Sequence, residues 1–361
     1  MAVIRADAGV AIGSGHVRRC LVLRDRLAAR GWATAFASAP ESLEAVPALR
    51  RGVGFEPVAG GDGRILDRLR RAWPQGVDLL VVDGYGIGRA FEAAARPWAK
   101  RILVIDDLAD RGHDCDMLLD ANYGRRPSDY ADLVSRNCRL LLGPCYGLLR
   151  AEFRAERAQA LARRRLRRGV SRVFVSLGGI DPANATPLAL KALAAAGYRR
   201  EAEVVLGSAA PGLSQVCRLL PRLPFRARLH LDSDRVAALM ADCDLAIGAG
   251  GTMTWERFCL GLPSIVIPIA ENQLPASRAL TRDGQALVTA PIWALRPRDL
   301  AALVSRALSA HKLRDRLQAR NARCVDGVGA ARVVAEVERL VGGVRASRMP
   351  WFPGAKHDQG R

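Results

Sequence analysis

Short apolar runs rich in branched residues alternate along the chain with longer stretches whose apolar positions recur at helical spacing. In the first half, the runs predicted as strands are Val3–Arg5, Thr34–Ser38, Leu79–Asp83, Ile102–Ile105, Met117–Leu119 and Leu140–Gly143. The stretch His16–Arg30 between the first two strands has helical periodicity and is predicted as a helix. Alternation of this kind predicts a parallel sheet covered by helices on both faces.

The same alternation begins again after the middle of the chain. Strands are predicted at Arg172–Ser176, Glu203–Leu206, Leu229–Leu231, Leu245–Ile247, Ser264–Ile267 and Ala286–Val288, and helices at Ala183–Ala196, Leu213–Leu220, Asp234–Met240, Thr254–Leu260 and Leu274–Arg282. The chain has 361 residues, which is enough for two domains of ordinary size. The predicted fold is therefore α/β, with two Rossmann-like, doubly wound parallel-sheet domains that face a cleft.

Charge marks the expected seam between the two halves. The predicted units are an N-terminal domain over 1–155, a basic linker over 156–168, a C-terminal domain over 169–343 and a flexible tail over 344–361. The linker ends in a run of five arginines and one leucine, from Arg163 to Arg168. Such a run is typical of a solvated helix or linker.

The composition is that of a folded protein, with 50% hydrophobic and 25% charged residues, so wholesale disorder is excluded. The net charge of +19 would suit a partner that is a polyanion or a phosphorylated small molecule. The arginines are spread over every segment and no RNA-binding signature accompanies them. We therefore attribute the charge to general arginine richness and do not expect a nucleic-acid partner.

The N-terminus is charged from Arg5 onward, which argues against a secretory signal, and no apolar run approaches the length of a membrane span. The eight cysteines include no Cys-x-x-Cys pair and are interpreted as buried thiols. These features predict a soluble cytoplasmic protein without a membrane partner. The oligomeric state is left open.

A glycine loop follows the first predicted strand and precedes the first helix. It reads Gly13-Ser14-Gly15-His16, and a third glycine of a dinucleotide motif is missing because Arg18 stands there. Glycines let a ligand approach the backbone, and a helix N-terminus favours a neutral imidazole that can accept a proton. His16 is therefore a candidate base; the alternative is a histidine that caps or packs locally.

Two glycine loops occupy corresponding positions in the second half. Gly178 and Gly179 follow a strand, and they suit either a diphosphate or merely a tight turn. Gly248-Ala249-Gly250-Gly251-Thr252-Met253 leads into a helix that carries Glu256, whose carboxylate can accept the hydroxyls of a ribose. Asn272 and Gln273 follow the next strand. Adjacent strand ends converge, so these loops predict a nucleotide-sugar site in the second domain.

Acidic residues also follow strands in the first half, at Asp83 and at Asp106-Asp107. They suit sugar hydroxyls or a metal, or they cap helices. No set of ligands with metal spacing stands out, and neither a Walker sequence nor Gly-x-Ser-x-Gly is present. The sequence therefore predicts no metal and no cofactor.

With these loops in view, the sequence resembles the UDP-sugar hydrolases of pseudaminic acid biosynthesis, which cleave UDP-2,4-diacetamido-2,4,6-trideoxy-β-L-altropyranose. The motifs that carry the resemblance are Arg5-Ala6-Asp7, Ile12–Cys20, Asp83-Gly84-Tyr85, Ile105–Arg111, Leu142-Gly143-Pro144, Leu149–Phe153, Ser176–Pro182, Gly248–Gly251 with Trp255-Glu256, and Glu271-Asn272-Gln273. They run in order from about residue 3 to residue 340. The basic linker and the tail look longer than the family requires.

The resemblance implies the GT-B fold, similar to the enzyme that adds N-acetylglucosamine to lipid I. It implies that His16 is the catalytic histidine, that Glu256 binds the ribose of UDP, and that Gly250–Met253 lies near the diphosphate. The residues expected to bind the substrate are Gly13, Gly15, Tyr85, Gly178, Gly250, Gly251, Thr252, Met253, Glu256, Asn272 and Gln273.

UDP is a good leaving group, so the departing oxygen needs little protonation by an acid. The reaction instead needs a base that activates the water and amide dipoles that stabilise the charge on the diphosphate. We expect His16 to activate a water that attacks the anomeric carbon with inversion. One alternative is a GT-B glycosyltransferase with the same UDP pocket and a hydroxyl acceptor. The other is a non-catalytic protein that binds a nucleotide sugar or a nucleic acid.

Overall fold

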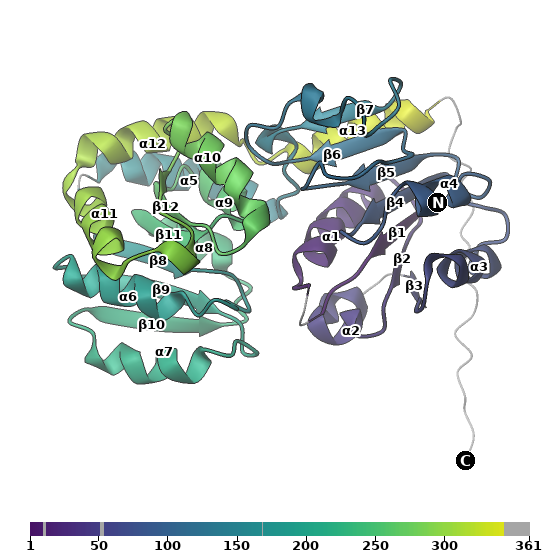
Figure 1. Cartoon of the computed structure of the whole chain (residues 1–361). Coiled ribbons are helices and arrows are strands. Elements are labelled where there is room, and N and C mark those ends of the chain that lie inside the picture. Colours follow the sequence, from purple (N-terminus) through teal and green to yellow (C-terminus); the bar gives the residue numbers. More distant parts are fainter. Residues whose placement is uncertain (10–11, 51–53, 168, 343–361) are drawn as a thin grey trace, which may run out of the picture.

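The strands of the protein form two separate sheets, each built entirely from parallel neighbours (Figure 1). The computed structural model describes residues 1–9, 12–50, 54–167 and 169–342. The predicted tail, 344–361, lies outside the described residues. The two-domain α/β architecture that the alternation predicts is confirmed.

The first sheet has seven strands in the order β3-β2-β1-β4-β5-β6-β7. They are β1 (Ala2–Ala6), β2 (Thr34–Ser38), β3 (Gly54–Pro57), β4 (Leu79–Asp83), β5 (Ile102–Ile105), β6 (Met117–Asp120) and β7 (Arg139–Leu142). Every strand predicted in this half is present. The edge strand β3 is additional, and its half-buried Phe55 is its only large apolar side chain apart from a terminal proline, so the apolar signal is weak.

Alternating residues of β1 build two cores, one on each face of the first sheet. Ile4 packs in a cluster with residues of α1 (Gly15–Ala28) and α13 (Gly329–Val341). Val3 points the other way, into a cluster with residues of α3 (Asp62–Ala72) and α4 (Arg89–Ala95). The short helix α2 (Ser42–Ala45) follows β2. The period of two along a buried strand therefore places helices on both faces.

The second sheet has six strands in the order β10-β9-β8-β11-β12-β13. They are β8 (Arg172–Ser176), β9 (Glu201–Leu206), β10 (Arg226–Leu231), β11 (Leu245–Ala249), β12 (Ser264–Ile267) and β13 (Leu287–Val288). Its helices are α6 (Thr186–Ala195), α7 (Leu213–Leu219), α8 (Val236–Asp242), α9 (Met253–Cys259), α10 (Leu274–Arg282), α11 (Pro297–Ser309) and α12 (His311–Cys324). Helices α6 and α11 cover one face, while α8 and α9 cover the other. The six strands and five helices predicted for this half are all present, with ends shifted by a few residues.

The predicted basic linker differs from the structure in an informative way. Its described part continues the helix α5 (Ala151–Leu166), which packs against α8 and α9. Arg164 is buried, and its guanidinium donates to the carbonyl oxygens of Cys243, Leu260 and Met240, at the ends of those two helices. Carbonyls at a helix C-terminus lack partners within the helix, so a buried cation there is stabilising. The run is thus a packing element rather than only a solvated segment.

The last described helix also departs from the expected extent of the second domain, 169–343. Val333, Val334 and Val337 of α13 belong to the core of the first sheet, together with residues of β1 and α1. Figure 1 shows α13 lying along the first domain, beside β6 and β7. The chain therefore crosses between the domains twice, once between β7 and α5 and again before α13.

The cysteines confirm part of the prediction made for them. All eight are free thiols, and Cys20, Cys115, Cys243 and Cys259 are buried as expected. Cys145 and Cys217 are exposed, which corrects the expectation of buried thiols at those two positions. No helix in the described part of the chain has both the length and the apolar character needed to cross a membrane.

Candidate active site

The candidate site lies where loops of both domains meet. The order of the first sheet reverses between β1 and β4, and loops at such a switch point diverge to leave room for a ligand. A cavity of about 210 Å³ lies there and is closed by loops of the second domain. Its polar lining includes His16, Arg19, Tyr85, Asp107, Asn122, Thr252, Asn272 and Gln273.

His16 is held by a carboxylate from the neighbouring strand. It lies on the first turn of α1, directly after β1, and Asp83 is the last residue of β4. His16 Nδ1 lies 2.5 Å from Asp83 Oδ1, and both side chains are almost completely buried. An ionised carboxylate only accepts hydrogen bonds, so a proton on Nδ1 faces Asp83, and in the neutral imidazole this leaves the lone pair on Nε2. This arrangement gives His16 the tautomer that a general base needs.

Arg19, one helical turn after His16, fixes the same carboxylate. Its Nε lies 2.6 Å from Asp83 Oδ2 and its Nη2 lies 2.6 Å from Asp83 Oδ1. Its Nη1 donates at 2.8 Å to both carboxylate oxygens of Asp107, which follows β5. Burial alone would raise the pKa of Asp83, but the charge of Arg19 and the hydrogen bonds from Arg19 and His16 hold that pKa well below its usual range. Asp83 therefore stays an anion and keeps orienting the imidazole.

Tyr85 contacts both the base and the opposite domain. Its ring meets the His16 ring edge to face, with centroids 4.6 Å apart. Its hydroxyl accepts a hydrogen bond from Asn272 Nδ2 at 3.0 Å, which joins the two domains across the cavity. Burial and the nearby Asp107 charge raise the pKa of Tyr85 to about 12, so the hydroxyl remains protonated. Tyr85 is thus a neutral polar group next to His16.

The second domain contributes a loop of small residues between β11 and α9. Gln273 holds this loop, because its Oε1 accepts from the amides of Gly250 at 3.1 Å and Ile269 at 3.0 Å. A Cβ on Gly250 would approach Gln273 Oε1 to 3.1 Å, so the close approach favours glycine here. Gly251 and Thr252 also face the cavity. The loop presents backbone rather than bulky side chains to any ligand.

The structure brings together most of the residues predicted from the sequence. His16, Gly15, Tyr85, Gly250, Gly251, Thr252, Asn272 and Gln273 all line the cavity. Trp255, from the same helix as Glu256, lines it as well.

Four predicted residues lie outside the lining. Gly13 exchanges backbone hydrogen bonds with Gly9 and has φ +74°, which indicates a turn role, and Gly178 has φ +103° in its own turn. Met253 Sδ lies 3.9 Å from Ser176 Oγ. Glu256 is largely buried, with one oxygen 4.0 Å from Arg150 Nε, and burial raises the pKa of its carboxyl.

Nothing in the sequence pattern pairs His16 with Asp83 or singles out Arg19 and Asn122. Asp83 and Asp107 were expected to bind sugar or metal or to cap helices, whereas both are ion-paired to Arg19. The one local signal is that Arg19 follows His16 by three residues and so lies on the same helix face. Among the described residues, no group of three or more histidine, cysteine or acidic side chains is arranged to hold a metal ion.

Comparison with known proteins gives both sequence and fold relatives, although no family model matches the chain. The spore coat polysaccharide biosynthesis protein SpsG of Bacillus subtilis is 31% identical over 58% of this chain, and the match covers 63% of that protein, less than two thirds of its length. The UDP-2,4-diacetamido-2,4,6-trideoxy-β-L-altropyranose hydrolase of Campylobacter jejuni is 25% identical over 78% of this chain and 96% of its own length.

Among solved structures, MurG of Acinetobacter baumannii superposes with a TM-score of 0.69 at 15% identity. The match covers 94% of this chain and 99% of MurG. At this identity the likeness establishes the fold alone, and it confirms the predicted GT-B architecture. The chain is therefore a GT-B protein, and its resemblance to the UDP-2,4-diacetamido-2,4,6-trideoxy-β-L-altropyranose hydrolases is confirmed.

Proposed function

We propose that the protein hydrolyses UDP-2,4-diacetamido-2,4,6-trideoxy-β-L-altropyranose to UDP and the free sugar. The observation that carries the proposal is the buried His16–Asp83 pair, at 2.5 Å, in a cavity that loops of both domains line. The similarity to the Campylobacter jejuni hydrolase over 78% of the chain supports this choice of substrate.

In the proposed reaction, His16 Nε2 takes a proton from a water as that water attacks the anomeric carbon. The bond between this carbon and the diphosphate oxygen breaks, its electron pair leaves with UDP, and the sugar configuration inverts. Asp83 stabilises the imidazolium that forms, because its carboxylate accepts the hydrogen bond from Nδ1–H throughout. Proton transfer to a positioned base is worth about 10²–10⁴-fold in rate.

The second domain would hold UDP. The backbone of Gly250 and Gly251 faces the cavity, and amide dipoles there would stabilise the charge that develops on the departing diphosphate. Glu256 would accept hydrogen bonds from the ribose hydroxyls. Because Glu256 does not line the cavity, this role requires the ligand to reach beyond the present lining.

The test is UDP release from a panel of UDP-sugars in buffer without an acceptor, followed by proton NMR. We expect UDP and a free diacetamido-trideoxy sugar from the cognate substrate. Tight UDP binding with no release until an alcohol acceptor is added would contradict hydrolysis. It would instead favour a GT-B glycosyltransferase.

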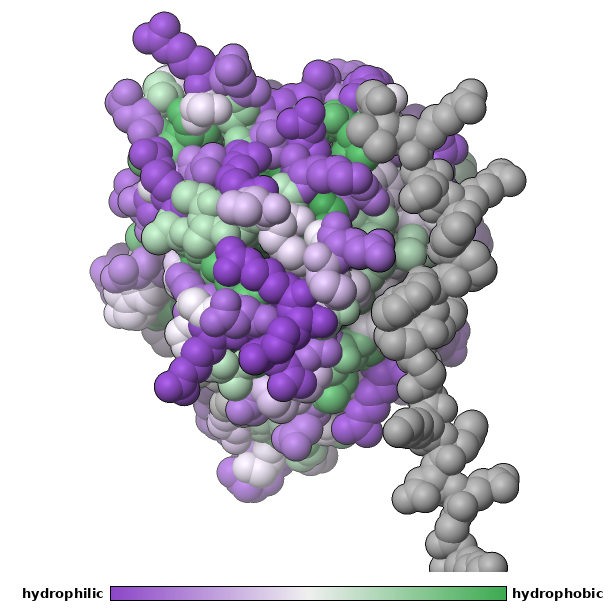
Figure 2. Space-filling view, turned by 90° about the vertical axis from the view of Figure 1, so that its right-hand side faces the viewer, coloured by the Kyte–Doolittle hydropathy of each residue, from purple (hydrophilic) through white to green (hydrophobic). Residues whose placement is uncertain are grey.

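A glycosyltransferase is the second candidate function, because the solved structures with a similar fold include MurG and glycosyltransferases. A membrane-facing apolar patch on the first domain would favour an acceptor held in a membrane. Figure 2 shows the face of that domain around α3 and α4, where hydrophilic residues cover most of the visible surface and apolar ones occur in small separate groups. This face, at least, gives the transferase no added support. A protein that only binds nucleotide sugars would show UDP affinity and no turnover with any acceptor.

A further inference from the structure

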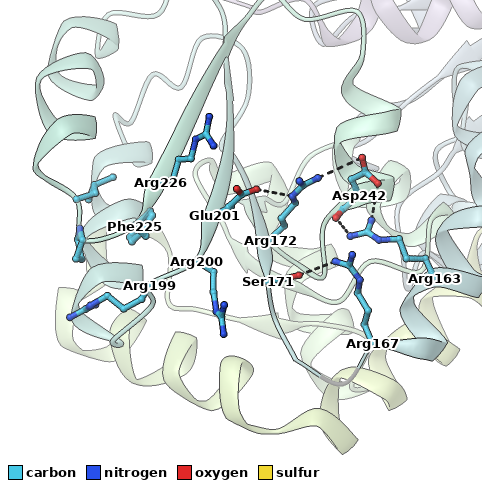
Figure 3. A pocket seen from close by; sticks show the side chains of 12 residues that line it. Arg163, Arg167, Ser171, Arg172, Arg199, Arg200, Glu201, Phe225, Arg226 and Asp242 are labelled. Atoms are coloured by element: carbon cyan, nitrogen blue, oxygen red, sulfur yellow. Dashed lines mark hydrogen bonds and ion pairs between the residues drawn. The ribbon is translucent and has the colours of Figure 1, made fainter.

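A second cavity lies at the opposite end of the second sheet from the candidate active site. It has a volume of about 840 Å³ and is lined where β8, β9 and β10 begin, whereas the candidate active site lies where parallel strands end. Six arginines line it, and we call it the arginine pocket: Arg163, Arg167, Arg172, Arg199, Arg200 and Arg226 (Figure 3).

Carboxylates hold one wall of the arginine pocket in place. Arg172 Nε lies 2.9 Å from Glu201 Oε2, and its Nη1 lies 3.8 Å from Asp242 Oδ2. Arg163 Nη1 lies 3.0 Å from Asp242 Oδ1. Figure 3 shows Arg172 between these two carboxylates. These guanidinium groups are therefore oriented before any ligand arrives.

The other wall carries exposed arginines whose charge is not balanced locally. Arg199 donates to the carbonyl oxygen of its neighbour Tyr198. For Arg200 and Arg226, no carboxylate partner is found within the described part of the chain. Arg167 and Arg200 lie on either side of Ser171, whose hydroxyl is 2.9 Å from Arg167 Nη1 (Figure 3). Six cations thus stand beside two carboxylates in the lining, Glu201 and Asp242, and a third carboxylate, Asp244, lies 3.6 Å from Arg163 Nη2 and from Arg167 Nη1.

This crowding of like charge has an electrostatic cost in the empty pocket. Burial lowers the pKa of Arg163, and the neighbouring Arg167 charge lowers it further. An anion bound among the arginines would relieve that repulsion, and phosphate oxygens match the planar donors of guanidinium groups.

The form of the pocket favours a compact anion over a nucleic acid. It is an open depression at one end of the sheet, and its one aromatic residue, Phe225, is only 6% exposed and packs against Tyr198. A base therefore finds no aromatic face on which to stack, although stacking is what usually holds single strands. A volume of about 840 Å³ is within the range of small-molecule sites.

We propose that the arginine pocket binds a linear oligophosphate of three or more phosphate groups, either free or as the phosphate chain of a nucleotide. Arg172 and Arg163 would contact it as oriented donors, while Arg199, Arg200 and Arg226 would close over it from the opposite wall. The arginine pocket is separate from the candidate active site, so the proposal does not depend on the proposed reaction, and only its test uses the proposed binding of UDP.

The experiment is calorimetric titration of the full chain with tripolyphosphate in the presence of saturating UDP, which blocks the cleft. The pocket variant is Arg199→Gln, Arg200→Gln and Arg226→Gln together. The control variant, Arg64→Gln, Arg71→Gln and Arg136→Gln, removes the same charge from exposed positions of the first domain. UDP affinity, measured on each variant, reports whether the fold is intact.

We expect the pocket variant to bind tripolyphosphate about 30-fold more weakly, at about threefold for each exposed arginine, while UDP affinity is unchanged. The control variant should bind within about twofold of the wild type, because distant exposed charges are screened. ATP binding as tightly as tripolyphosphate would identify the phosphate chain as the recognised part, and tighter ATP binding would identify a nucleotide as the source.

Equal losses in the two variants would overturn the proposal, since they would show a general charge effect. So would a single-stranded oligonucleotide whose binding depends on the pocket arginines while tripolyphosphate does not bind.

Discussion

At the scale of single residues, Asp83 holds the candidate active site together. This buried carboxylate lies within hydrogen-bond distance of His16 Nδ1, Arg19 Nε and Nη2, and the thiol of Cys20 at 3.3 Å. Each of these groups favours the ionised form, and the Arg19 contacts leave the imidazole little freedom to turn. Asp83 is thus a positioning residue for His16.

Removing either member of the pair should abolish most of the turnover. His16→Asn or Asp83→Asn should each lower kcat by about 10²–10⁴-fold, because the base is lost or is released from its productive tautomer. The double variant should be scarcely worse than His16→Asn alone, since the two side chains act as one unit. Steady-state kinetics with UDP affinity as the fold control would check this. Additive losses would show that Asp83 acts independently of His16.

The pH dependence of stability follows from the same carboxylate. In the unfolded chain an aspartate has a pKa of about 3.9. In the folded protein the pKa of Asp83 is lower. Above the unfolded pKa, the ionised Asp83 therefore contributes to the stability of the fold. This contribution is lost as the pH falls through the lower, folded pKa.

Wild type should exceed Asp83→Asn in unfolding free energy at neutral pH by about 3–5 kcal/mol, the usual cost of breaking a buried pair. The gap should shrink below about pH 4. Urea unfolding of both proteins over this pH range would measure it. A gap that stays constant would mean that Asp83 is not the charged partner of Arg19.

At the scale of helices and strands, the buried segments are the predictable part. Strands such as β4 and β12 are continuous apolar runs because both faces of a parallel sheet are covered, so the sequence pattern alone predicts them. The edge strand β3 is half exposed and lacks such a run. The positions of the loops that follow the strands of both sheets were also predictable. These loops bring His16, Gly250 and Asn272 to one cavity.

What the sequence could not supply is pairing between distant side chains. His16 and Asp83 are separated by 67 positions, and each has an ordinary local role as a capping or packing residue. The same holds for α13, whose amphipathic pattern would suit either domain. Only the packing of Val333 and Val337 against the core around Ile4 decides between them.

The placement of α13 makes its own prediction. Val337→Ala removes two buried methyl groups from the core of the first domain and should cost about 1–3 kcal/mol, or several degrees in Tm. Arg26→Ala, on the exposed side of α1, should change stability by less than about 0.5 kcal/mol. Thermal unfolding of both variants gives the comparison. Equal effects would contradict the assignment of α13 to the first domain.

At the scale of the whole molecule, the cavity between the domains is too small for its proposed ligand. Its volume of about 210 Å³ is below the range of about 300–1,000 Å³ typical of ligand sites. A nucleotide sugar would therefore extend beyond this cavity or enter as the domains move apart. The hydrogen bond from Asn272 to Tyr85 across the cavity is one contact that such opening would break. Part of the net charge of +19 is concentrated in one place, because six arginines line one pocket of the second domain.

If that hydrogen bond helps to close the domains over substrate, Asn272→Ala and Tyr85→Phe should raise KM by similar factors. A single hydrogen bond is worth about 0.5–1.5 kcal/mol, or about 2–12-fold. Combining the two changes should add little, because both remove the same bond. A much larger effect of Asn272→Ala would instead show that the amide contacts the substrate directly.

In the proposed reaction, a water activated by His16 attacks the anomeric carbon of the sugar. Turnover in ¹⁸O-labelled water, followed by early-time mass spectrometry and proton NMR of both products, tests this claim most directly. We predict that ¹⁸O enters the free sugar, that UDP gains none, and that the first-formed anomer has the inverted configuration. Label in the phosphate of UDP, or a first-formed anomer of retained configuration, would contradict the account.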